Sequence, residues 1–221
     1  MRIQNVSQAE FAFPSGRVAL AIPVFEDEAG TTSPLIEEAD ARAIARLREK
    51  GTVRGKPQEV LFLPSVSGAY DGVVLLGLGN RGACTAETVR RTAGKACESL
   101  GAHRIETVVC DAASIVAHAH GIAEGIMLGQ YRFDQYKERK TDEPAPQAVE
   151  MVMLVVEQAD TDLTLRYEQA RTACESANWA RDLANTPSND MTPSRLAGEA
   201  LEMAEDADLS LIHISEPTRP Y

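Results

Sequence analysis

A G-x-G-x-x-G pattern occupies Gly77–Gly82. In nucleotide-binding proteins such glycines let the backbone approach a pyrophosphate, and the helix that follows points its N-terminus at the phosphates. The pattern here follows an apolar run, and Asp111 ends the next strand, where a ribose-binding acid would lie. The helix start at Thr85 comes after the last glycine, so a strand-to-loop turn explains the glycines better than a phosphate cradle.

The histidines are poorly spaced for a metal site. His118 and His120 are two residues apart, about 200° around a helix, whereas zinc-binding pairs on helices are four residues apart. His103 and His213 are isolated in the sequence. For His118 and His120 we therefore expect surface or helix-packing roles.

The acidic residues gather in three groups, Glu26–Glu28, Glu37–Glu38 and the four residues Glu202, Glu205, Asp206 and Asp208. Paired carboxylates serve as general acid and base or bind metal ions. None of these groups adjoins a histidine or a glycine-rich loop. Solvated helix faces and strand ends therefore explain them better than a catalytic pair.

The cysteine pattern is typical of reduced, cytosolic thiols. The four cysteines, Cys84, Cys97, Cys110 and Cys174, form no C-x-x-C pair, which fits neither a zinc ribbon nor a disulfide-rich secreted domain. No cysteine has the context of a nucleophile, and the sequence contains neither G-x-S-x-G nor H-E-x-x-H.

The composition indicates an acidic globular protein. The 221 residues carry a net charge of −11 and are 44% hydrophobic, enough for one large domain or for one domain and part of another. The negative charge argues against nucleic acid or an anionic membrane as the main partner. No apolar stretch reaches the roughly 18 residues of a membrane span, and Met1–Gln8 lacks the apolar core of a signal peptide. We expect a cytoplasmic protein.

Apolar strands alternate with amphipathic helices along the chain. The expected strands are Val18–Phe25, Glu59–Leu63, Gly72–Leu78, Ile105–Cys110 and Met151–Val156. The expected helices are Ser33–Lys50, Thr85–Gly101, Ala112–Arg132, Asp162–Ala184 and a last helix from Thr192-Pro193. This alternation predicts an α/β fold, with a mixed or largely parallel sheet flanked by helices.

Two of the helices carry apolar positions that predict how they pack. Between Asp162 and Ala184, the buried side is expected to hold Leu165, Ala173, Ala177 and Leu183. In the stretch Glu124–Lys137, glycines four residues apart predict close packing of a helix against the sheet. The aromatic residues that follow, Tyr131, Phe133 and Tyr136, are expected to anchor the end of that helix to the core.

Three segments, in the same order, resemble the leucyl aminopeptidases of peptidase family M17. The first is the apolar strand and G-L-G turn of Val74–Gly79, and the second is the E-G-x-x-L-G-x-Y-x-F-x-x-Y-K pattern of Glu124–Lys137. The third and most specific is Ala180–Ala197, with the sequence ARDLANTPSNDMTPSRLA. Together they extend the resemblance over roughly residues 15–205.

The resemblance implies the front part of a di-metal exopeptidase. It implies a macro-like N-terminal α/β domain over residues 1–157 that supports assembly into a homo-hexamer. It also implies a connector helix over 158–184 and the start of an incomplete catalytic domain over 185–208. In this family, two divalent ions, zinc or manganese, activate a water that attacks the N-terminal peptide bond of a peptide substrate.

The family's metal ligands come from a segment with lysine and aspartate and from a later N-T-D-A-E-G-R-like segment, and neither is present here. We therefore assign no catalytic, metal-binding or cofactor-binding residue, and we expect the 221 residues alone to be inactive. The five residues that match the family near the end of the chain are expected to be structural: Asn185, Pro187, Asn189, Thr192 and Pro193.

Two alternatives stay open at this point. The chain could be a stand-alone phosphate- or nucleotide-binding module that uses Gly77–Gly82, or a purely structural assembly domain. Residues 209–221 are expected to be a non-native tail, because they end on two prolines with no closing element and resemble translated vector sequence.

Overall fold

The computed structural model describes residues 1–28, 30, 33–137, 148–158 and 161–209. The chain divides into two compact units, Met1–Glu175 and Ser176–Tyr221, and each is described by itself. The first unit contains a six-stranded sheet. His213 and most of the expected tail lie outside the described residues.

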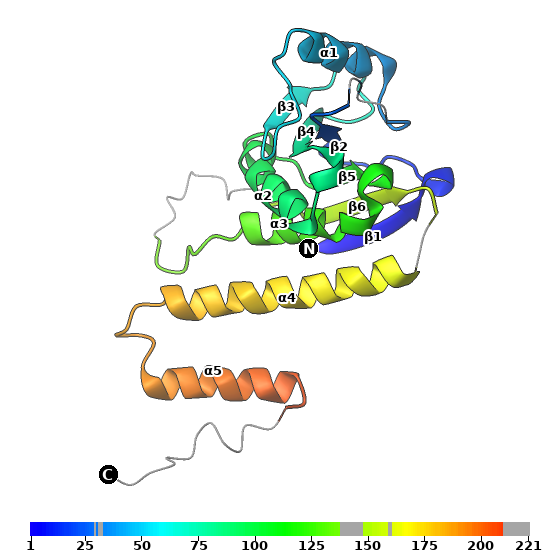
Figure 1. The fold of residues 1–221 in the computed structure, drawn as a ribbon. Helices are drawn as coiled ribbons and strands as arrows, with labels where there is room; N and C mark the ends of the chain where they lie inside the picture. Colours follow the sequence, from blue (N-terminus) through cyan, green and yellow to red (C-terminus); the bar gives the residue numbers. More distant parts are fainter. Residues whose placement is uncertain (29, 31–32, 138–147, 159–160, 210–221) are drawn as a thin grey trace. The chain divides into compact units, whose positions relative to one another are not determined.

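The sheet has the strand order β1-β6-β5-β2-β4-β3, and all neighbours are parallel except the pair β3–β4 (Figure 1). Its strands are β1 Arg2–Ser7, β2 Val18–Phe25, β3 Val60–Pro64, β4 Gly72–Gly79, β5 Thr107–Asp111 and β6 Met151–Val156. The expected α/β fold with a mixed, mostly parallel sheet is confirmed.

The sequence reading missed β1. Only Ile3 and Val6 among its residues are strongly apolar, so no strand pattern stands out. The strand is held by tertiary pairing at the sheet edge, where it aligns with β6 from Arg2 opposite Met151 to Ser7 opposite Val156.

Side chains of successive residues point to opposite faces of the sheet, and each face has its own core. On one face, Ala19, Val74 and Cys110 belong to the same core as the apolar stripes of α2 (Ala86–Ala102) and α3 (His120–Gly129). On the other, Leu20 and Leu75 pack with Ile44 of α1 (Glu38–Glu49). The helices therefore cover both faces, with α2 and α3 side by side (Figure 1).

The ends of α1 and α2 differ from the sequence expectation. Helix α1 begins at Glu38, because the Ser33 hydroxyl accepts a hydrogen bond from the Leu35 N–H at 3.2 Å and forms a separate turn. Helix α2 starts after Thr85 as expected, and the Thr85 hydroxyl accepts from the Thr88 N–H at 3.2 Å. It runs past Gly101, and the residue with positive φ that ends it is Arg104, at 54°.

The expected helix Ala112–Arg132 is two helices. A 3-10 helix, η3, covers Ala113–His118, with Ile115 in a non-helical conformation inside it, and α3 follows as His120–Gly129. Ile115 is buried in the core shared with α2. Packing of that side chain outweighs the helical preference of the alanines around it.

Helix α4 spans Thr161–Asn185, but its expected buried side was wrong. Leu165 is 60% exposed and Ala173 is also exposed. The buried positions are instead Leu163, Tyr167, Ala170 and Cys174. These four are spaced i, i+4, i+7 and i+11, which defines one helical stripe, and the large ring of Tyr167 selects that stripe over the alanine-rich one.

The second unit contains α5, Pro193–Asp206. The Thr192 hydroxyl accepts from the Arg195 N–H at 3.3 Å, so the expected N-cap is present. Ala204 is buried, whereas Leu196 is 47% exposed. The turn before α5 uses the Pro187 carbonyl, which accepts from the N–H groups of Asp190 and Met191 at 2.9 and 2.8 Å.

Candidate functional site at the carboxyl ends of the strands

The carboxyl ends of β2, β4 and β5 meet at one edge of the sheet, at Phe25, Gly79 and Asp111. From there β2 leads to α1 on one face, and β5 leads to α3 on the other. Open α/β sheets bind their ligands at such a point, outside the carboxyl ends of strands whose connections diverge. The edge formed by these three carboxyl ends is therefore the candidate functional site.

Arg81 occupies this edge. Its backbone N–H donates to both carboxylate oxygens of Asp27, at 3.0 and 3.2 Å. Its guanidinium donates to the Ser114 carbonyl at 2.9 Å, forms an ion pair with Glu28, and lies 4.1 Å from the centre of the Phe25 ring. The hydrogen bond to Glu28 raises the pKa of Arg81. A single side chain thus ties together the loops that follow β2, β4 and β5.

Gly77 and Gly79, the first two glycines of the pattern, are used for packing inside the protein. The Gly77 N–H donates to the Glu59 carbonyl and the Gly79 N–H to the Gly55 carbonyl, both at 2.7 Å. A Cβ on Gly77 would overlap the Lys56 carbonyl, and one on Gly79, where φ is 76°, would lie 2.8 Å from the Pro57 ring. The loop amides that a phosphate would need at Gly77 and Gly79 are already bonded.

A second anion-binding arrangement lies in the turn before β3, and it too is filled from within. The backbone N–H groups of Arg54, Gly55 and Lys56 all donate to Oε2 of Glu59, at 2.9, 2.6 and 3.2 Å. Consecutive amides of this kind form a nest that binds anions. At this edge, backbone carbonyls accept from the Gly77 and Gly79 amides, and the Glu59 carboxylate fills the nest, which favours a structural role for the glycine loop.

Asp111 does not point to a ribose site either. It is buried at the end of β5, and its Oδ1 accepts a hydrogen bond from the Ala113 N–H at 3.3 Å. This bond starts the turn into η3. The carboxylate therefore has a local structural partner.

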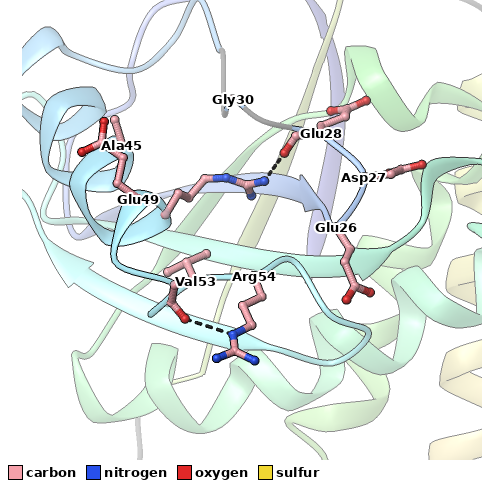
Figure 2. Close-up of a pocket in the computed structure, with 10 residues that line it drawn as sticks. Glu26, Asp27, Glu28, Gly30, Ala45, Glu49, Val53 and Arg54 are labelled. Atoms are coloured by element: carbon pink, nitrogen blue, oxygen red, sulfur yellow. Dashed lines mark hydrogen bonds between the residues drawn. The ribbon is translucent and has the colours of Figure 1, made fainter.

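Beside this edge lies a pocket of about 600 Å³ between the β2–α1 loop and the end of α1 (Figure 2). Arg48 spans it and donates through Nη2 to the Phe25 carbonyl at 3.1 Å and to the Glu28 carbonyl. Arg54 donates to the Gly51 carbonyl at 3.1 Å. The lining residues are Glu26, Asp27, Glu28, Gly30, Ala45, Arg48, Glu49, Gly51, Val53 and Arg54.

The pocket is polar and acidic, and two arginines already bond to backbone carbonyls in it. Throughout the described parts of the chain, no three His, Cys, Asp or Glu side chains come together in a way that could hold a metal ion. The described residues therefore do not fit the di-metal centre that the resemblance implies for the whole enzyme.

The histidines lie apart from this edge. His103 stacks on Phe62 with ring centres 3.8 Å apart, and its Nδ1 is 2.8 Å from the Ser99 carbonyl oxygen. His118 ends η3 and His120 begins α3. The expected opposite orientation of the two side chains assumed one continuous helix. Because η3 ends and α3 begins between them, that assumption does not hold. Burial lowers the pKa of His120.

Cys84, Cys97 and Cys110 are free thiols. Burial raises the pKa of Cys97 to about 11, and it also raises the pKa of Cys84 and of Cys110. A thiol needs a lowered pKa to act as a nucleophile near neutral pH. These three cysteines are therefore packing residues.

The stretch Glu124–Lys137 packs differently from the expectation. Gly125 and Gly129 face α2, where a Cβ on Gly125 would lie 2.7 Å from that of Ala93. The sheet is contacted instead by Ile122 and Ile126. Of the aromatic residues, Tyr131 and Phe133 are half-buried, but Tyr136 is 47% exposed and anchors no core.

Comparison with known proteins identifies the family of this chain. The sequence model of the "Cytosol aminopeptidase family, N-terminal domain" matches residues 21–140, more than half of the 221 residues. The chain belongs to the cytosol aminopeptidase family. Among curated relatives, the probable cytosol aminopeptidase of Geobacter sulfurreducens is 34% identical over 209 residues, and that of Aquifex aeolicus is 29% identical over 199 residues.

These alignments cover 90% and 86% of this chain but only 41% and 38% of the two aminopeptidases. Among solved structures, the bottromycin maturation enzyme BotP has a TM-score of 0.66 at 26% identity and covers 88% of this chain and 38% of its own. A mutant of tomato leucine aminopeptidase has a TM-score of 0.71 at 17% identity, covering 93% and 42%, and shows the shared fold. This chain therefore spans about 40% of the length of its aminopeptidase relatives.

A further BotP structure, solved in complex with Mn, has a TM-score of 0.62 at 25% identity. Within the described ranges of the present chain, no helix is long and apolar enough to cross a membrane.

Proposed function

We propose that this chain is the N-terminal, non-catalytic part of a di-metal leucyl aminopeptidase that releases N-terminal amino acids from peptides. The observation that carries the proposal is the family match over residues 21–140. It is supported by the share of each relative that the chain spans, about 40%. Manganese or zinc, held by residues outside this sequence, would activate the attacking water.

The 221 residues alone do not hydrolyse peptides under this proposal. The support is that the sequence lacks both ligand segments of the family, and that the described side chains form no cluster of three metal-binding groups. We assign no catalytic step to any residue of this chain. What its residues supply is a rigid α/β body whose carboxyl-end loops are tied together by Arg81.

The proposal extends to organisation and setting. Residues 1–157 would form an assembly domain that contributes to a homo-hexamer in the cytoplasm, and 158–184 would connect it to a catalytic domain that starts at 185–208. Residues 209–221 would be a non-native tail. Sedimentation of the purified chain tests the assembly role, since discrete oligomers are expected and a monomer at all concentrations would contradict it.

The activity test uses leucine p-nitroanilide with added Mn²⁺ or Zn²⁺. The purified 221-residue chain is expected to give no turnover above the metal-only blank. The full-length aminopeptidase of Geobacter sulfurreducens serves as the positive control. Hydrolysis that co-purifies with the chain and is lost with chelator would overturn the proposal.

A further inference from the structure

Helix α4 docks on the α2–α3 face through one stripe. Leu163 and Tyr167 belong to the same core as the buried residues of α2 and α3. One turn further along the stripe from Ala170, the Cys174 thiol lies 3.9 Å from the Glu124 carbonyl oxygen of α3. The first four turns of α4 are therefore part of the α/β unit, although they lie outside the sheet.

His120 lies at the start of α3 with a ring nitrogen that has no partner. Its Nδ1 is buried and makes no hydrogen bond. A protonated ring would make Nδ1 a buried N–H donor without an acceptor, and such a group costs free energy. His120 is also the first residue of α3, and the N-terminal end of a helix disfavours positive charge because of the helix dipole. The local structure thus suits only a neutral His120.

The charges around His120 point the same way. Arg90 of α2, Arg166 of α4 and His118 of η3 all oppose its protonation, and Glu124 of α3 alone favours it. Glu124 is already committed, because its Oε2 lies 2.6 Å from the Arg90 guanidinium. A protonated His120 would therefore add a further cation beside the Glu124 carboxylate, which already pairs with Arg90.

The geometry points to a pH-sensitive contact: α4 docks firmly on α2 and α3 while His120 is neutral, and the docking loosens when His120 is protonated. Arg166 of α4 carries the effect, because its positive charge opposes protonation of His120, and its guanidinium also pairs with Asp162 at 2.9 Å. This device is independent of the proposed peptidase activity. It would let acidification loosen the helix that leads out of the α/β unit.

The direction of the effect follows from linkage. The pKa of His120 is lowered in the folded protein, mainly by burial, from the ordinary value of about 6.5. Full docking is therefore present above about pH 6.5, and it is lost as the pH falls through the lowered pKa. Each unit of lowering corresponds to roughly a tenfold change in the docking equilibrium.

Hydrogen exchange of the whole chain, read by mass spectrometry over residues 163–175, tests this. After correction for intrinsic rates, protection is expected to fall on the order of tenfold between about pH 7.5 and about pH 5. His120→Gln, which cannot titrate, is expected to remove that fall. His103→Gln, at the far end of α2, is the matched control that should keep it.

Two further measurements test the inference if His120→Gln does not fold. Arg166→Gln removes the repelling cation and should reduce the fall in protection. The imidazole resonance of His120 in the unaltered chain should titrate at the same midpoint as the loss of protection. Constant protection in the unaltered chain, an undiminished fall in folded His120→Gln, or midpoints that disagree would overturn the inference.

Discussion

Gly125 of α3 lies directly against Gly94 of α2, and the two helices touch backbone to backbone at this point. A Cβ built on Gly125 would be 2.9 Å from the Gly94 nitrogen, and one on Gly94 would be 3.3 Å from the Gly125 carbonyl oxygen. A real Cβ does not fit at 2.9 Å from a backbone atom, and at 3.3 Å it fits only if its neighbour moves by a few tenths of an ångström. The close spacing of α2 and α3 thus depends on having glycine at both position 94 and position 125.

Gly125→Ala is expected to destabilise the protein by about 1–3 kcal/mol, because overpacking outweighs the gain of up to ~1 kcal/mol in helix propensity. Urea unfolding monitored by circular dichroism gives the value. Gly82→Ala is the matched control, since nothing lies within 4 Å of its would-be Cβ and little change is expected. Equal stabilities of the two variants would show that the helices tolerate separation.

Arg81→Ala should free the three carboxyl-end loops from one another. Its guanidinium bonds to Ser114, pairs with Glu28 and covers the Phe25 ring, but the side chain is 44% exposed. Solvent screening therefore limits the expected loss to about 1 kcal/mol of unfolding free energy.

Hydrogen exchange distinguishes local from global loosening in Arg81→Ala. Residues 26–28 and 112–115 are expected to exchange faster, whereas the strands keep their protection. Arg81→Lys retains the charge but cannot make all three contacts, so it should resemble Arg81→Ala. Unchanged exchange in both variants would refute the role of Arg81 as a tie.

Asp40 should contribute to stability in an acid-dependent way. Burial alone would raise its pKa, but hydrogen bonds from the Ser65 hydroxyl at 2.6 Å and the Val66 N–H at 3.2 Å help to hold the pKa below its ordinary value. Its stabilisation is thus present above about pH 4 and is lost as the pH falls through the lowered pKa.

Asp40→Asn is therefore expected to cost about 1–3 kcal/mol at neutral pH, because the part-buried hydrogen bonds from the Ser65 hydroxyl and the Val66 N–H lose a charged acceptor. The cost should shrink below about pH 4, where the native carboxylate is itself protonated. Thermal melts of both proteins across this pH range measure it. A penalty that is the same at every pH would mean that the carboxylate charge plays no part.

Cys97 should be slow to react in the folded protein. Its pKa of about 11 makes the thiolate at least about 100-fold scarcer at pH 8 than in an unfolded chain. Iodoacetamide labelling with peptide mass mapping, in buffer and in urea, gives the two rates. Comparable rates in both would show that the Cys97 thiol is more accessible than its half-buried position in the structure implies.

Strong local patterns predicted most of the fold correctly. Continuous apolar runs such as Val18–Phe25 and Met151–Val156 match β2 and β6 residue for residue. The caps at Thr85 and Thr192 act as expected, because a hydroxyl at a helix start has a local partner. The weakly apolar β1 went unseen, since only pairing with β6 makes it a strand.

The candidate site was less accessible from the sequence. The glycine pattern of Gly77–Gly82 is visible in it, but its meaning depends on Glu59 and Asp27, which lie far along the chain and reach these loops only after folding. Arg81 gave no sequence signal beyond its place inside the pattern. Its role comes from the meeting of three strand ends.

The sequence by itself determined the family, the strand and helix types and the acidic character, because these depend on local patterns and composition. The tertiary structure decided which side of α4 is buried, which partners the loop amides take, and that Gly125 faces α2 and not the sheet. The physical reason is that a helix with two apolar stripes, or a loop with unbonded amides, has no local preference among partners. Only the packed neighbours make one choice lower in free energy.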